Sequence, residues 1–145
     1  MPTIDETIMI QRTPHEVFEF ATDPEKVPLY STNLVTYEKT SEGPVRKGAK
    51  FAGDVRVAGK MFHWTSENVE FDPDHSWTTR SIESPMPWEI HVDLIPDNGG
   101  TRVTWHQETG DWGGFFGKLA EPLVTRMYSR DVKSNLEKMK DLLEA

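Results

Sequence analysis

Apolar residues near the end of the chain follow the spacing of a helix with one buried face. From Val124 to Leu143 they recur every three or four residues, which is the spacing of a single helical stripe. This stripe consists of Val124, Tyr128, Val132, Leu136, Met139 and Leu143. A second apolar row occupies only the first half of the region and consists of Phe116, Leu119, Leu123 and Met127. We therefore predict a long helix over residues 113–143 whose wide apolar arc near its start needs a second layer or a ligand.

One proline falls inside this predicted helix. Pro122 has no backbone N–H and its ring collides with the preceding turn, so we expect it to kink the helix or to restart it.

The beginning of the chain predicts one strand and two short helices. Residues 3–10 alternate apolar and polar positions, as a strand does. Thr13, Pro14 and Glu16 then give a capping residue, a proline at the first helical position and an acidic partner for the cap. The pair Asp23-Pro24 repeats this pattern and predicts a second short helix through Leu29.

The middle of the chain predicts antiparallel strands joined by tight turns. Counting back from the Ala58-Gly59 turn places Phe62 opposite Val55 and Trp64 opposite Gly53. Residues 97–100 (Asp-Asn-Gly-Gly) form the clearest hairpin turn, and counting outward from it pairs Ile90 with Gln107.

In one predicted strand, the inward-facing positions switch from even to odd residue numbers along its length. Trp64 and Val69 fall on opposite faces by simple alternation, so we expect a β-bulge within Thr65–Asn68. Counting through the turn at residues 72–75 sets Glu67 opposite Arg80.

Length and charge limit the classes of function. A chain of 145 residues is expected to form a single domain over residues 1–145 with a sizeable core. A net charge of −8 argues against nucleic acid and against an anionic membrane surface as partners. The N-terminal residues lack a basic segment followed by an apolar run, and no apolar run reaches membrane-spanning length. We expect a cytoplasmic protein without membrane insertion, and the sequence leaves open whether it forms a homodimer.

The residues that bind metals and cofactors give little signal. The chain contains no cysteine, no phosphate-binding loop and no dinucleotide motif. His91 and His106 face each other across the last hairpin, but on its polar face and without a third ligand. His15 and His75 lie at a helix start and in a turn, where local hydrogen bonds satisfy them. We predict no metal site and no cofactor.

The predicted inner face carries rings and a few polar groups. The chain contains five tryptophans and seven phenylalanines, more rings than the core between one helix and one sheet has room for. Glu67 and Arg80 are either an ion pair at the rim of the sheet or a polar anchor inside a cavity, where a shifted pKa would let an acid move protons. They are the candidate catalytic residues. The candidate ligand-binding residues are Tyr37, Trp64, Glu67, Arg80, Trp88, Trp105, Gln107, Leu123, Met127 and Tyr128.

The order of these elements and four stretches of sequence resemble a known family. The stretches are residues 12–30, 64–81, 97–105 and 115–144, among them DNGGTRVTW and FFGKLAEPLVTRMYSRDVKSNLEKMKDLLE. Over its whole length the chain resembles the polyketide cyclase/dehydrase branch of the START-like superfamily, which includes the major birch pollen allergen. The resemblance implies an α+β helix-grip fold, in which a curved antiparallel sheet of seven strands wraps around a long C-terminal helix, with two short helices after the first strand.

The resemblance also implies a cavity for a small hydrophobic ligand, but it does not decide the activity. Members of the family include aromatase/cyclases, carriers of lipids or hormones, and proteins that bind quinones or other proteins. We expect this protein to bind a polyketide-like, aromatic or lipid ligand, with cyclisation or dehydration as the enzymatic version. A carrier or sensor of a lipid or quinone is the alternative. A third class is a protein-interaction module that uses an exposed segment, Trp112–Phe116.

Overall fold

A seven-stranded antiparallel sheet forms most of the molecule. The computed structural model describes residues 2–145. The strands are β1 (Thr3–Ile10), β2 (Leu34–Lys39), β3 (Lys50–Val57), β4 (Lys60–Asp72), β5 (Ser76–Glu83), β6 (Trp88–Asp97) and β7 (Gly100–Thr109). Their order in the sheet is β1-β7-β6-β5-β4-β3-β2, so each strand from β2 to β7 lies beside its neighbour in the chain and β1 closes the edge next to β7. This is the predicted α+β helix-grip arrangement.

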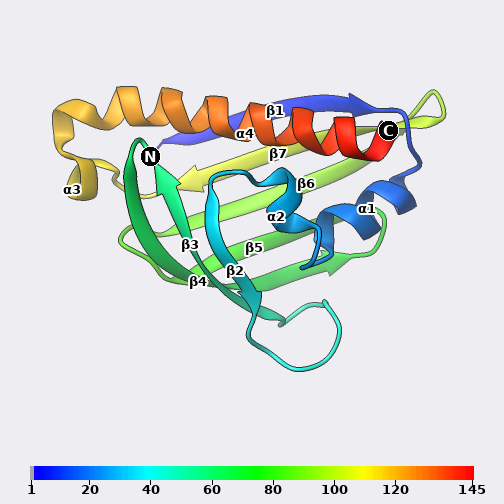
Figure 1. The fold of residues 1–145 in the computed structure, drawn as a ribbon, viewed down its shortest axis with the longest axis horizontal. Coiled ribbons are helices and arrows are strands. Elements are labelled where there is room, and N and C mark those ends of the chain that lie inside the picture. The colour runs from blue at the N-terminus through cyan, green and yellow to red at the C-terminus, as the bar shows by residue number, and fades with distance from the viewer. Residues whose placement is uncertain (1) are drawn as a thin grey trace.

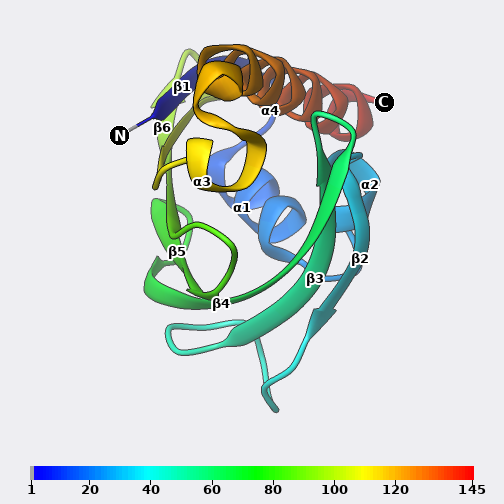
Figure 2. The ribbon, with the colours of Figure 1, turned by 90° about the vertical axis from the view of Figure 1, so that its left-hand side faces the viewer.

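Helices cover the concave face of this sheet. They are α1 (Pro14–Thr22), α2 (Val27–Tyr30), α3 (Gly113–Phe116), the 3-10 turn η1 (Lys118–Ala120) and α4 (Glu121–Glu144). Figure 1 shows α4 running along the sheet beside β1, with α1 and α2 below its C-terminal end. Figure 2 looks along the molecule and shows the sheet curling round from β1 to β2 while α4 closes the gap between the two edges.

Of the two short helices after β1, only α1 starts at its predicted capping residue. Thr13 caps α1: its side chain accepts a hydrogen bond from the backbone N–H of Glu16, and the Glu16 carboxylate accepts one from the backbone N–H of Thr13. The second short helix starts later than predicted. Asp23 forms a local turn by accepting a hydrogen bond from the backbone N–H of Glu25 at 2.9 Å, and α2 begins only at Val27.

The long C-terminal helix restarts at its proline, as predicted. Gly117 adopts φ 95°, a left-handed conformation that favours glycine, and separates α3 from η1. The helix α4 then begins at Glu121, with Pro122 in its first turn. The N–H groups of the first turn make no hydrogen bond within the helix, so a proline there costs none.

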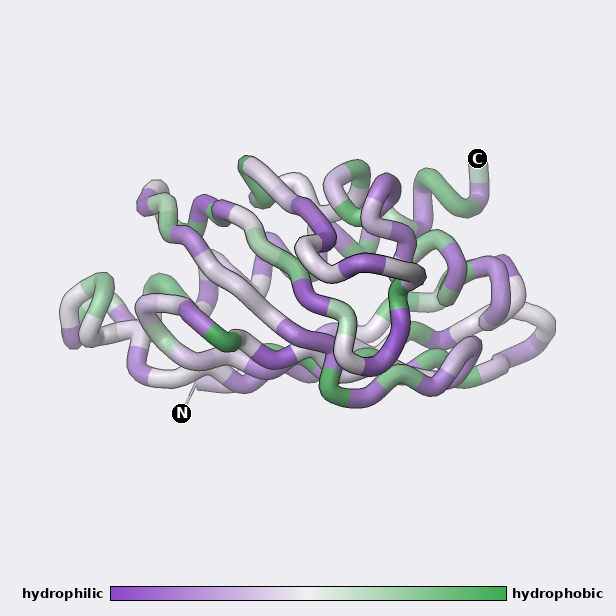
Figure 3. Tube along the Cα trace, turned by 90° about the horizontal axis from the view of Figure 1, so that it is seen from below, coloured by the Kyte–Doolittle hydropathy of each residue, from purple (hydrophilic) through white to green (hydrophobic). Residues whose placement is uncertain are grey.

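The strand registers agree with those counted from the turns. Val55 pairs with Phe62 and Gly53 with Trp64 in the β3–β4 hairpin, and Ile90 pairs with Gln107 in the β6–β7 hairpin. Buried and more exposed residues alternate along β3 and over most of β4, because successive side chains point to opposite faces. Figure 3 shows hydrophobic and hydrophilic residues interspersed along the whole chain. The register therefore decides which residues face α4.

Two hydrophobic clusters hold the helix to the sheet. The cluster at the C-terminal half of α4 includes Val132, Leu136 and Met139 together with residues of β1, β6, β7 and α1. The cluster at the other half includes Val124 and Trp112 together with residues of β3 and β4. The predicted stripe is thus the buried face of α4. Among the described residues, no helix is both long enough and apolar enough to cross a lipid bilayer.

Most of the second apolar row is exposed; only Phe116, in α3, is partly buried against the second cluster. Leu119, Leu123 and Met127 are 100%, 57% and 38% exposed. The row runs along a different side of the helix from the stripe, beyond the arc that the sheet covers. The expectation that Leu123 and Met127 belong to the interior is wrong for this reason.

Replacing Leu136 tests the buried stripe. Its side chain is 2% exposed in the larger cluster, so Leu136→Ala should lower the free energy of unfolding by about 2–5 kcal/mol. Leu123→Ala, a change of the same chemistry on the exposed side of α4, should alter it by about 0.5 kcal/mol or less. Denaturant unfolding of both variants measures the difference, and equal losses would contradict the assignment of the buried face.

Candidate functional site

A cavity lies between the concave face of the sheet and the middle of α4, where Tyr128, Val132 and Asn135 line it. Its volume is about 150 Å³. This is roughly ten times the ~10–15 Å³ that one water molecule needs, and below the ~300–1,000 Å³ of pockets for drug-sized ligands. The interior space expected from the sequence is therefore present, and it suits a compound of one or two rings.

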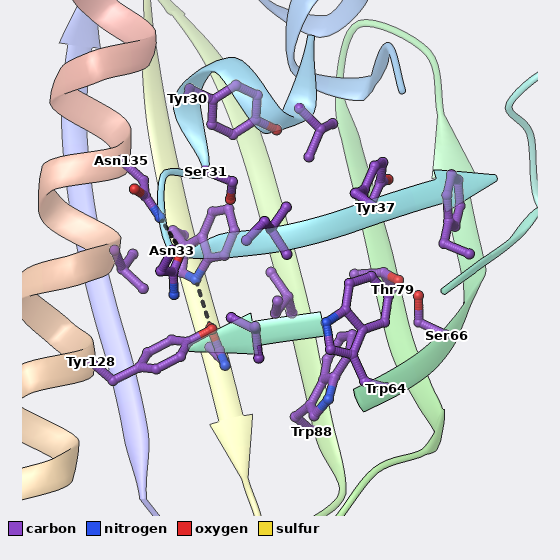
Figure 4. A pocket seen from close by; sticks show the side chains of 18 of the residues that line it. Tyr30, Ser31, Asn33, Tyr37, Trp64, Ser66, Thr79, Trp88, Tyr128 and Asn135 are labelled. Carbon is purple, nitrogen blue, oxygen red and sulfur yellow. Dashed lines mark hydrogen bonds between the residues drawn. The ribbon is translucent and has the colours of Figure 1, made fainter. Parts of the chain in front are cut away.

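The aromatic residues of the chain converge on this cavity. All five tryptophans and all three tyrosines line it. They come from both ends of the sheet and from α2 and α4, and Figure 4 shows Tyr37, Trp64, Trp88 and Tyr128 pointing into one space from different elements. Tyr37, Trp64, Trp88, Trp105, Gln107 and Tyr128, all predicted from the sequence, lie in the wall of the cavity.

Ring contacts fix the orientation of these side chains. Tyr37 stacks on Phe51 with centroids 5.6 Å apart and an interplanar angle of 18°. Trp64 meets Trp88 edge to face, with centroids 5.6 Å apart. Opposite Trp64, a Cβ on Gly53 would lie 2.8 Å from the indole ring, so the glycine allows the indole to lie flat on β3.

Two hydrogen-bonded groups connect the cavity wall to α4. The indole N–H of Trp105 donates to Oε1 of Gln107 at 3.1 Å, and the Gln107 side chain is hydrogen-bonded to Tyr128 of α4. Nδ2 of Asn135, also on α4, donates to Oδ1 of Asn33 at 3.1 Å (Figure 4). Both groups are neutral and fully engaged within the protein.

Other polar atoms in the wall have no partner. The hydroxyl of Tyr37 and the indole N–H groups of Trp64 and Trp88 make no hydrogen bond with residues 2–145 but keep some access to solvent, whereas the indole N–H of Trp112 is buried without a partner among these residues. An indole N–H can only donate, so such a group facing a cavity is satisfied only by an acceptor that enters it.

The candidate catalytic pair lies outside the cavity. Glu67 pairs with Arg80 across β4 and β5 as predicted, but neither residue lines the cavity. Nη2 of Arg80 instead donates to Oε1 of Glu89 at 3.2 Å on the exposed face of the sheet. The polar anchor inside a cavity is therefore wrong, and the alternative ion pair is not formed either, because Arg80 pairs with Glu89 and not with Glu67.

The position of the bulge explains this correction. The β4–β5 register shifts between Thr65 and Ser66 and again between Asn68 and Glu70. The second shift leaves Val69 without a partner, so the parity of β4 changes after Glu67. Alternation from Trp64 therefore continues inward through Ser66 and Asn68, and Glu67 faces outward.

The segment Trp112–Phe116, which was predicted to be exposed, is buried in part. Trp112 is 1% exposed, and Phe115 and Phe116 are partly buried against the second cluster. Phe115 meets Phe62 edge to face with centroids 5.5 Å apart. Within this segment Trp112 is therefore buried, whereas Phe115 and Phe116 keep part of their surface exposed.

The histidines of the last hairpin have separate partners. His91 and His106 pair across β6 and β7 as predicted. The ring of His91 is hydrogen-bonded to Thr78, and that of His106 to Asp5 of β1. This arrangement agrees with their interpretation as surface histidines.

Comparison with known proteins assigns the family. A sequence model described as polyketide cyclase/dehydrase and lipid transport matches residues 1–144. The chain belongs to this family. No curated protein matched the chain.

Solved structures show the same fold at low sequence identity. TTHA0849 from Thermus thermophilus is 21% identical with a TM-score of 0.86, over 99% of this chain and 97% of that one. The ZhuI aromatase/cyclase from Streptomyces sp. R1128 is 18% identical with a TM-score of 0.82, over 98% and 93%. Ara h 8.0201 is 13% identical with a TM-score of 0.72, over 98% and 97%. The family and these neighbours together support a fold that binds hydrophobic ligands.

In this member of the polyketide cyclase/dehydrase and lipid transport family, several residues that line the cavity were not predicted from the sequence. They include Tyr30, Ser66, Asn68, Trp77, Thr79 and Asn135. Simple alternation from Phe62 and Trp64 would have placed Ser66 and Asn68 inside. Asn135 lies seven residues after Tyr128, which is two helical turns along the same face.

Burial keeps the tyrosine hydroxyls protonated. It raises the pKa of Tyr30, Tyr37 and Tyr128 above the ordinary value, because the phenolate would lose its hydration. The hydrogen bond from Gln107 opposes this rise at Tyr128. At physiological pH these groups therefore act as neutral donors and acceptors.

An alkaline titration tests this description of the wall. Because all three tyrosines have a raised pKa, the native protein should show no phenolate absorbance near pH 10, where exposed tyrosines titrate. Above pH 10 only the unfolded chain releases these protons, so stability should fall as the pH rises further. The urea-unfolded protein, as a control, should titrate near pH 10. A tyrosine that titrates there in the folded protein would contradict the structure.

Proposed function

We propose that this protein binds a small, neutral, planar aromatic compound with hydrogen-bond-accepting oxygens, and that it holds this compound as a non-catalytic carrier or sensor. The observation that carries the proposal is the composition of the cavity wall. It contains every tryptophan and tyrosine of the chain. Within the described part of the chain, none of the lining side chains is charged.

The wall favours a neutral ligand over an ionic one. Aromatic rings supply a large apolar contact area at fixed orientations, which suits a flat ring system. A charged group in this cavity would lose its hydration and find no opposite charge among the lining residues, at a cost of several kcal/mol. A carboxylate or an ammonium ion on the ligand should therefore be excluded.

The unpartnered donors favour oxygen atoms on the ligand. Tyr37, Trp64 and Trp88 offer one hydroxyl and two indole N–H groups to whatever enters. A carbonyl or phenolic oxygen would satisfy them, whereas a pure hydrocarbon would leave them unpaired. A ketone, a quinone or a polyketide-like ring compound has this combination of flat apolar surface and acceptor oxygens.

Cyclisation or dehydration of a keto compound is the second candidate. It is supported by the family description and by the likeness to an aromatase/cyclase. With Glu67 and Arg80 on the outer surface, the groups left for chemistry are neutral hydroxyl, amide and indole donors. These can polarise a carbonyl oxygen but supply no charged base. For this reason binding without turnover is our first proposal.

A matched set of bicyclic compounds tests the proposal. We expect the ketone 1-tetralone to bind more tightly than the hydrocarbon tetralin, and the anion 1-naphthoate to bind most weakly. Tyr37→Phe keeps the ring and removes only its hydroxyl, so it should reduce the affinity for the ketone about two- to tenfold, the value of one hydrogen bond. The affinity for tetralin should stay unchanged. Isothermal titration calorimetry measures all of these affinities.

Glu67→Gln is the control, because it neutralises a carboxylate outside the cavity and should leave every affinity as in the wild type. Tightest binding of the anion, or equal binding of ketone and hydrocarbon, would refute the proposed ligand class. If the wild-type protein converts a poly-β-keto compound, as detected by mass spectrometry, the protein is an enzyme and the proposed non-catalytic role is wrong.

A further inference from the structure

Three side chains that can bind a metal meet at the junction of α1 with the β4–β5 turn. His15 and Glu19 belong to α1, and Asp74 lies in the turn between the two strands. One ligand atom from each residue lies within 4.8 Å of the other two. Two ligand atoms on one tetrahedral zinc ion, each bonded at ~2.0–2.2 Å, are ~3.3–3.6 Å apart. A small side-chain rotation therefore brings all three within bonding distance of one ion.

The core beneath these residues fixes their separation. His15 and Glu19 are four residues apart on α1 and so project from one face of the helix. Phe18, on the buried face of α1, meets Phe71 with centroids 5.1 Å apart and Trp77 with centroids 5.6 Å apart. Phe71 is in β4 and Trp77 in β5, one on each side of the turn. The distance between α1 and the turn is thus set by packing rather than by the three polar groups.

Not every polar group at this junction has a partner among the described residues. Nδ1 of His15 is hydrogen-bonded to Oδ1 of Asp74 at 2.9 Å. Glu19 makes no hydrogen bond or ion pair with the described residues, although its carboxylate lies beside this pair. The carboxylates of Glu19 and Asp74 both lie beside the imidazole. A cation at this position would be attracted by the same charges.

The donor set indicates the kind of cation. Imidazole together with carboxylate suits zinc and its neighbours among the transition metals, whereas magnesium and calcium prefer oxygen ligands alone. We propose that His15, Glu19 and Asp74 bind one zinc ion, with water in the remaining coordination position, and that the ion ties α1 to the β4–β5 turn. The sequence pattern did not indicate this site, because Asp74 is 59 residues from His15 in the chain.

Zinc titration of the whole protein, freed of metal with a chelator, tests the site. We expect one equivalent to bind in calorimetry and to raise the melting temperature, since an ion that binds the folded state stabilises it. Magnesium at the same concentration should do neither. Glu19→Gln keeps the His15–Asp74 hydrogen bond but weakens one ligand, so it should reduce the zinc affinity by about tenfold or more. His15→Gln should abolish binding.

A second exposed histidine supplies the matched control. His63 is hydrogen-bonded to Asp54 at 3.1 Å on another part of the sheet but belongs to no three-residue cluster among residues 2–145. His63→Gln should leave zinc binding unchanged. Equal losses from His63→Gln and His15→Gln, or full affinity in Glu19→Gln, would show binding to single surface histidines and overturn the proposal. Failure of zinc to bind the wild-type protein would overturn it too.

Discussion

The packing of one face of α4 against a curved sheet is the constraint on which the rest of the structure depends. At the C-terminal half of the helix, aliphatic side chains such as Val132 and Leu136 meet residues of β1, β6 and β7 and fill the space between the layers. At the N-terminal half the sheet curves away toward β3 and β4, and the space is lined by large rings. The cavity lies between the two clusters: Tyr128, Val132 and Asn135 of α4 line one side, and rings such as Trp64 and Trp88, which meet edge to face with centroids 5.6 Å apart, line the other.

Side chains of α4 contact two other parts of the cavity wall. Asn135 on α4 holds the start of β2 through Asn33, and the break at Gly117 turns α3 so that Trp112 packs against Tyr128. A change in the helix start would therefore move the wall as well as the surface. This coupling explains why the aromatic residues are spread over the whole sequence yet line a single space.

The chemistry of the site depends on one detail of strand geometry. A shift of one residue in a strand moves every following side chain to the opposite face. In β4 the bulge at Val69 lies after Glu67, so neutral Ser66 and Asn68 face the cavity and the carboxylate faces outward. Had the bulge come before Glu67, the interior would contain an acid and the molecule would be suited to proton transfer. The neutral wall instead favours reversible binding of a neutral compound.

The local rules of the sequence determined most of the fold. Capping residues defined the start of α1, glycine and asparagine turns set the hairpin registers, and the apolar spacing identified the buried stripe of α4, because each of these depends on neighbours in the chain. They also placed Tyr37, Trp64, Trp88, Trp105, Gln107 and Tyr128 in the interior. Only the tertiary structure decided the rest. The extent of the sheet left Leu123 and Met127 in solvent, the position of the bulge put Glu67 and Arg80 outside, and folding brought Asp74 beside His15, because these outcomes depend on surfaces that are distant in sequence.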